Sequence, residues 1–201
     1  MSDRTKAPRF LVIGYGNPGR FDDGLGPALA ARLEDLASET ITIDSDYQLQ
    51  VEYAEDVSRY DVVVFADAAV SGPEPFYVSE IEPRPTLSFS SHSLGPSEVL
   101  GLAQMLFRAK TRGFVLGIRG YQFDSFSERL SESAQANLAA AQSFLESVLS
   151  SGNIQELESG DSASVRRHGP KLDRNQPRSL SCKTASTSSC ALTTTRTSGS
   201  R

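Results

Sequence analysis

The hydrophobic positions of this chain fall into short apolar runs separated by longer stretches of mixed character. Runs of about four to eight apolar residues are typical of buried strands. The run at residues 62–68 is apolar almost throughout, as a strand covered on both faces would be, whereas the run at 76–82 alternates and is predicted to form an edge strand. We expect strands over residues 9–14, 40–44, 62–68, 76–82 and 113–118.

Between these runs, apolar residues recur at spacings of three and four, which indicates helices. We expect helices over residues 27–36, 97–107 and 132–149. Ser131 precedes the last of them and is able to cap it. Strands that alternate with helices predict an α/β fold, in which a twisted, mostly parallel sheet forms the middle of three layers and helices flank it.

The periodic pattern ends near residue 150. Ser and Thr make up 13 of the 23 residues 179–201, and such a segment cannot bury enough apolar surface to offset its conformational entropy. We therefore expect a flexible N-terminus at 1–8, a folded domain at 9–150 and a disordered Ser/Thr-rich tail at 151–201.

Charge separates the folded domain from the tail. Residues 151–201 hold 8 basic and 4 acidic residues, which leaves 12 basic and 21 acidic residues in the first 150. A domain this acidic lacks the basic surface that nucleic acids require, so a protein partner is favoured. Both cysteines, Cys182 and Cys190, lie in the tail, so the domain has no disulfide framework and no thiolate metal site.

The N-terminus is polar and has no apolar signal segment. No apolar run approaches the roughly 20 residues that a membrane span needs. We expect a cytoplasmic monomer without membrane contact.

Polar side chains follow three of the predicted strands. Asp22 and Asp23 come after the first strand, Asp67 ends the strand at 62–68, and His92 follows the strand at 76–82. Ligands of parallel sheets bind beyond the carboxyl ends of the strands. Two carboxylates and one imidazole would suit a metal with open positions, or general acid–base chemistry. Structural roles are the alternative: capping by the acidic pair, a buried hydrogen-bonded Asp67 and a solvated His92.

The segment GYGNPGRFDDGLG, residues 14–26, carries the glycine spacing of a dinucleotide-binding loop at Gly14, Gly16 and Gly19. In that alternative the protein is an oxidoreductase, and Asp44 or Asp46 binds the ribose. However, the loop continues through several polar residues before a helix begins, and its acidic pair would repel a phosphate. We favour a turn that carries Asp23 into the crevice.

Three segments together resemble the hydrogenase maturation proteases. They are GYGNPGRFDDGLG at 14–26, VVVFADAAVSG at 62–72 and SSHSLGPSEVLGLAQML at 90–106, and the resemblance covers residues 10–149. It implies an endopeptidase that removes the C-terminal extension from the nickel-loaded precursor of a [NiFe]-hydrogenase large subunit. That precursor is the implied partner and presents the nickel, and no organic cofactor is implied.

The resemblance also implies roles for individual residues. Asp23, Asp67 and His92 fall on the positions that recognise nickel and catalyse cleavage, and Gly16, Asn17 and Asp22 form the supporting loop. Many family members carry an Asp-Gly-Gly-Thr type of segment after the second strand, which is absent from residues 44–57 here. Asp44 and Gln48 stand in that segment and are expected to take part in partner selection. The same residues would also serve a nickel-dependent chaperone that binds the precursor without cutting it.

Overall fold

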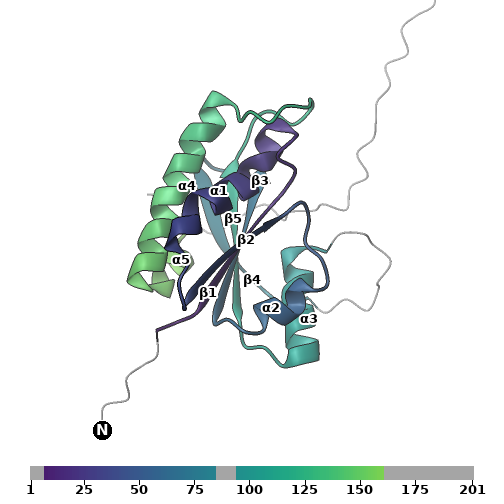
Figure 1. Ribbon diagram of the computed structural model, residues 1–201, viewed down its shortest axis with the longest axis vertical. Coiled ribbons are helices and arrows are strands. Elements are labelled where there is room, and N and C mark those ends of the chain that lie inside the picture. The colour runs from purple at the N-terminus through teal and green to yellow at the C-terminus, as the bar shows by residue number, and fades with distance from the viewer. Residues whose placement is uncertain (1–6, 85–93, 161–201) are drawn as a thin grey trace, which may run out of the picture. The chain divides into compact units, whose positions relative to one another are not determined.

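The centre of the molecule is a five-stranded mixed sheet. The computed structural model describes residues 7–84 and 94–160. The strand order is β2-β1-β3-β5-β4, and all neighbouring strands are parallel except β4, which runs antiparallel to β5 at one edge (Figure 1). The mostly parallel sheet and the edge position of the alternating strand are therefore confirmed. The strands are β1 (Phe10–Tyr15), β2 (Ile41–Asp46), β3 (Val62–Ala69), β4 (Phe76–Ile81) and β5 (Arg112–Arg119).

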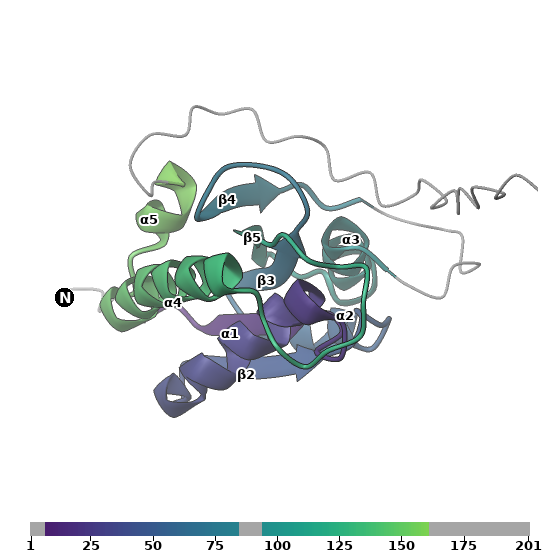
Figure 2. The same cartoon turned by 90° about the horizontal axis from the view of Figure 1, so that it is seen from above.

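Helices cover both faces of the sheet, which gives the three predicted layers. Helices α1, α4 and α5 lie on one face, and α2 and α3 lie on the other (Figure 2). None of the helices in the described part of the chain is long and apolar enough to cross a membrane. The helices are α1 (Leu25–Leu33), α2 (Tyr53–Val57), α3 (Pro96–Phe107), α4 (Glu132–Ser151) and α5 (Ile154–Ser159), with short 3-10 turns η1 (Phe21–Gly24) and η2 (Glu34–Leu36).

Successive residues of β3 supply the two halves of the core, because side chains alternate across a strand. Val62 and Val64 pack with α1 and α4, while Val63 and Phe65 pack with α2 and α3. All eight residues of β3 are buried, as the apolar run predicted. Asp67 continues the alternation of Val63 and Phe65 and so lies on the face that α2 and α3 cover.

Helix α1 packs so closely against β1 and β3 that its backbone contacts theirs. A Cβ atom on Gly26 would lie 2.4 Å from the carbonyl oxygen of Tyr15 and 2.5 Å from that of Ala66. A Cβ on Gly14 would lie 2.1 Å from the carbonyl oxygen of Gly26. The first and last glycines of the segment at residues 14–26 therefore allow the helix to approach the sheet closely.

The predicted boundary at residue 150 is too early, because the folded part of the chain extends beyond it. Helix α4 ends at Ser151, and α5 follows over Ile154–Ser159 with Leu157 buried in the core. The polar composition of this segment gave no sign of the buried leucine. It also gave no sign of an ion pair in which an Arg112 guanidinium nitrogen lies 2.7 Å from a Glu158 carboxylate oxygen. The N-terminus at 1–6 and the tail from 161 onward lie outside the described residues, so the disorder assigned to them stays a prediction.

Candidate active site

The carboxyl ends of β1, β2, β3 and β5 meet at one edge of the sheet, because these strands are parallel and adjacent. The turn after β1 holds η1 with Asp22 and Asp23, and β2 ends at Asp46. Asp67 lies near the end of β3. This edge is where ligands of open α/β sheets bind.

Asp23 is half-buried and belongs to the turn itself. Its Oδ2 accepts a hydrogen bond from the backbone N–H of Asn17, with the two atoms 3.3 Å apart. The side-chain oxygen of Asn17 in turn accepts from Gly19 N–H at 2.9 Å. These two bonds fold the Asn-Pro-Gly segment back onto Asp23 and fix the backbone that presents this carboxylate.

Asp22 is fully buried and is held by four hydrogen bonds. Its Oδ2 accepts from the N–H groups of Tyr121 at 2.8 Å and Gln122 at 2.9 Å and from the Ser131 hydroxyl at 2.7 Å, and its Oδ1 accepts from Ser131 N–H at 2.7 Å. Burial raises the pKa of Asp22, but the hydrogen bonds from Ser131, Tyr121 and Gln122 together outweigh it and hold the pKa below its ordinary value. Asp22 therefore stays ionised and ties the turn after β1 to the β5–α4 loop, residues 120–131. Neither Asp22 nor Asp23 caps α1, whose N-cap residue is Gly24 without a side-chain cap bond.

The sequence had indicated that Asp67 ends the strand. In the structure, Asp67 lies within β3. The strand continues through Ala68 and Ala69 because both small residues extend the parallel ladder with β5. Asp67 is only 5% exposed, and its Oδ1 accepts from Ala68 N–H at 2.8 Å. A carboxylate is costly to bury in a central strand, and buried carboxylates of this kind are frequent at functional sites, so Asp67 remains a candidate site residue.

Tyr77 is a neighbour of this site that the sequence analysis missed. It lies on β4 opposite Gly117 of β5, and Gly117 is also the β5 partner of Asp67. A Cβ on Gly117 would lie 2.3 Å from the Tyr77 ring and 2.7 Å from its hydroxyl oxygen, so the phenol lies directly over this glycine. Burial raises the pKa of Tyr77, which keeps the hydroxyl protonated at neutral pH. The signal in the sequence was the glycine at 117 inside an apolar strand.

His92 lies outside the described residues. On either side of it, Arg84 N–H donates to the Ser97 carbonyl at 2.8 Å, and Leu94 N–H donates to the Leu49 carbonyl at 3.5 Å. Within residues 7–84 and 94–160, no three His, Cys, Asp or Glu side chains are arranged to hold a metal ion. The combination of Asp23, Asp67 and His92 therefore stays a prediction.

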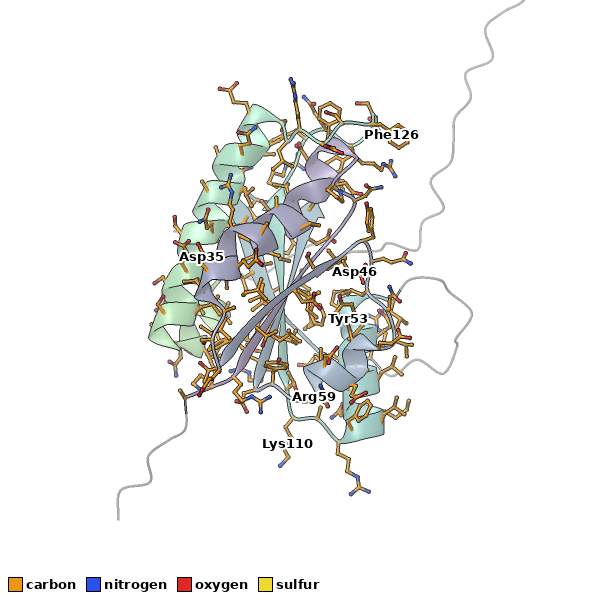
Figure 3. All side chains as sticks on the ribbon, viewed as in Figure 1. Asp35, Asp46, Tyr53, Arg59, Lys110 and Phe126 are labelled. Atoms are coloured by element: carbon orange, nitrogen blue, oxygen red, sulfur yellow. The ribbon has the colours of Figure 1, made fainter. Side chains whose placement is uncertain are left out.

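The residues assigned to partner selection lie at the surface, Asp44 within β2 and Gln48 after it. Asp44 and Gln48 are exposed, and Asp46 is half-buried. The Tyr53 hydroxyl donates a hydrogen bond to Asp46 Oδ2 at 3.5 Å (Figure 3). Burial, together with the charges of Asp44 and Asp46, raises the pKa of Tyr53. A role of Asp44 and Gln48 in selecting a partner stays a prediction.

The glycine turn offers no donors to a phosphate. Every N–H group from Gly16 to Asp23 already donates within the protein, Pro18 having none. The close approach at Gly16 is made by the chain itself, since a Cβ there would lie 2.1 Å from the Asp23 carbonyl oxygen. A pyrophosphate cradle needs free N–H groups, so this geometry speaks against the dinucleotide alternative. The acceptors are the carbonyl oxygens of Asp46, Asn17, Ser127, Gln122 and Arg20 and the side-chain oxygens of Asp23 and Asn17.

Several solved structures with this fold are hydrogenase maturation proteases. The [NiFe] hydrogenase maturation protease HycI from Thermococcus kodakarensis KOD1 superposes with a TM-score of 0.59 at 22% identity, over 73% of this chain and 95% of that one. The hydrogenase maturating endopeptidase HybD from E. coli gives 0.59 at 22% identity, over 72% and 94%. The hydrogenase 2 maturation peptidase from Thaumarchaeota archaeon SCGC_AB-539-E09 gives 0.52 at 25% identity, over 71% and 98%.

The chain thus has the α/β fold of the hydrogenase maturation proteases. This finding confirms the resemblance that its sequence motifs show. No protein-family model and no curated protein sequence matches the chain.

Proposed function

We propose that this protein is a hydrogenase maturation endopeptidase, which removes the C-terminal extension of a nickel-loaded [NiFe]-hydrogenase large-subunit precursor. The observation that carries the proposal is the position of Asp23 and Asp67. Asp23 lies in the turn that follows β1, and Asp67 lies near the carboxyl end of the adjacent strand β3, in a fold shared with known maturation proteases.

The chemistry follows from two carboxylates and an imidazole beside a substrate that brings its own metal. Asp23, Asp67 and His92 supply too few ligands for a complete metal site, and such a set suits a nickel ion that the precursor already coordinates. An unloaded precursor would offer nothing for these side chains to bind, so cleavage would depend on nickel.

Peptide hydrolysis requires one proton to leave the attacking water and one to reach the departing amide nitrogen. In this proposal a carboxylate at this edge accepts the first and delivers it to the nitrogen. The turn bonds around Asn17 fix the backbone of Asp23 before substrate arrives, which lowers the cost of orientation.

The test mixes the full-length protein with the nickel-loaded precursor and follows the intact mass of the precursor. We expect loss of a defined C-terminal peptide, and no loss from a nickel-free precursor. Asp23→Asn and His92→Ala should lower the cleavage rate by about a hundredfold or more. Asp35→Asn is the matched control, because this exposed aspartate lies far from the carboxyl edge (Figure 3).

Two results would contradict the proposal. Cleavage by both variants at the wild-type rate would show that the site is assigned wrongly. A stable nickel-dependent complex with an uncut precursor would instead identify the chaperone alternative, which uses the same residues without hydrolysis.

A further inference from the structure

The exposed large hydrophobic residues of the described part fall into two groups. One group surrounds the carboxyl edge of the sheet on the segments that follow β2, β3 and β5. We define these residues as the rim: Tyr47 (66% exposed), Val51 (43%), Val70 (61%), Tyr121 (40%) and Phe126 (88%). The other group, Met105, Leu106 and Phe107, lies at the end of α3, which leads into the amino end of β5.

Single exposed hydrophobic residues are ordinary, but a group on three loops around one edge is not. The rim loops come from strands in the order β2, β3 and β5, and the turn bearing Asp23 follows β1 between them. Figure 3 shows Phe126 at the end of the molecule opposite Arg59 and Lys110. The rim and the two candidate carboxylates, Asp23 and Asp67, are therefore carried by neighbouring segments at the same edge of the sheet.

The part of the rim after β3 and β5 is held in place by internal bonds. The Arg119 guanidinium lies 5.1 Å from the centre of the Tyr121 ring and also donates to the Val70 carbonyl. The Tyr121 hydroxyl donates to Glu74 Oε1 at 2.6 Å. Val70 and Tyr121 are thereby fixed relative to each other although both are exposed.

Phe126 lies on a loop whose backbone is tied to the turn of the candidate site. The N–H of Ser127 donates to the Gly19 carbonyl at 2.9 Å, and the N–H of Phe21 donates to the Ser127 carbonyl at 2.8 Å. Together with the bonds to Asp22, these contacts order the loop before any partner arrives. Apolar side chains on an ordered backbone lose little further entropy on binding, which is the property of a recognition surface.

The charges around the rim restrict the partner. Carboxylates outnumber guanidinium groups on these segments, and two of the arginines, Arg20 and Arg119, donate to the carbonyl oxygens of Phe123 and Val70. A partner segment should therefore combine apolar side chains with basic ones.

We infer that the rim is the surface on which the precursor docks, binding apolar and basic side chains of the precursor around the bond to be cut. This inference rests on the proposed function and assigns its protein-recognition surface. The rim binds the polypeptide itself, separately from the carboxylates that engage the nickel.

The experiment measures the KM for cleavage and the Kd for the uncut precursor with the full-length protein. Truncating the most exposed rim residues, Phe126→Ser and Tyr47→Ser, should raise both constants about tenfold in the double variant, as removal of a central aromatic contact does. Phe107→Ser is the control, because it removes an exposed phenylalanine (45% exposed) from the other group and should change neither constant. All three positions are exposed, so thermal unfolding should match the wild type within experimental error.

The outcomes separate the two proposals. If the wild type cleaves the precursor and the double variant keeps its KM and Kd, the rim is not the docking surface and the proposed function stands. An equal loss in Phe107→Ser also overturns the rim, because binding would then follow exposed apolar area in general. If the wild type neither binds nor cleaves the precursor, the proposed function and the rim fail together.

Discussion

Asp22 and Asp23 are neighbours in the chain with opposite surroundings. Asp23 is half-buried at the carboxyl edge, while Asp22 is fully buried among donors from the β5–α4 loop. A buried carboxylate with this many donors is stable only when ionised, and its removal leaves those donors without an acceptor.

We expect Asp22→Asn to lower the free energy of unfolding by about 2–4 kcal/mol at pH 7, because the amide brings an NH2 group against N–H donors. The folded-state pKa of Asp22 lies below its ordinary value, so its contribution is present above about pH 4 and is lost as the pH falls through the folded pKa. The gap between wild type and variant should therefore be constant from about pH 5 to pH 8 and should narrow in acid.

Denaturant unfolding over this pH range provides the measurement. Asp124→Asn, an exposed aspartate on the same loop, is the control and should have almost no effect. Equal stability of Asp22→Asn and wild type at pH 7, or a gap that widens in acid, would show that the bonds to Asp22 contribute no stability.

At the scale of elements, the contact between α1 and the sheet depends on glycine. Gly26→Ala would bring a methyl group within 2.4 and 2.5 Å of two carbonyl oxygens, and neither backbone can retreat without moving a strand. We expect a loss of roughly 3 kcal/mol or more in unfolding free energy.

The control is Gly19→Ala, where the nearest atom to the added methyl group is the Asn17 side-chain oxygen at 3.2 Å. Chemical denaturation of the two variants should separate them clearly. A Gly26→Ala protein as stable as Gly19→Ala would mean that the helix shifts without cost.

For the molecule as a whole, α5 adds a last contact between the C-terminal side of the domain and β4 and β5. We expect Leu157→Ala to lower the unfolding free energy by about 2–4 kcal/mol, because its side chain is buried in the core beside α4. Gln155→Ala on the exposed side of the same helix should change it little. If thermal unfolding of both variants matched the wild type, the original boundary at residue 150 would be the better description.

The sequence was sufficient to predict the strands and helices that have a strong hydrophobic periodicity. The five strands and the helices α1, α3 and α4 were predicted within a few residues, and Ser131 caps α4 by accepting from Ala134 N–H at 3.3 Å. Helices α2 and α5 were not predicted, because each spans only five or six residues, which is too short to show a helical period, and each is fixed by tertiary contacts.

The candidate site was predictable in part for a similar reason. The acidic pair and Asp67 follow apolar runs, so their gathering at one edge comes from strand order, which a local pattern indicates. The buried environment of Asp22, the Tyr77 ring over Gly117 and the anchored β5–α4 loop all depend on partners about 40 to 110 residues away. No local pattern encodes such pairings.

The hydrogen bonds that anchor the β5–α4 loop divide its residues into those that the attachment requires and those whose side chains can be substituted. Asp22 binds the backbone N–H groups of Tyr121 and Gln122 and the residue Ser131, so most side chains between these points take no part in the attachment. Gly120 is a fixed point, since a Cβ there would lie 2.9 Å from the Asp22 side chain. The side chains at the tip of the loop can therefore be exchanged for those of a relative while its two ends and the turn that bears Asp23 stay in place, so under the proposed function this loop is the place to engineer a change of precursor.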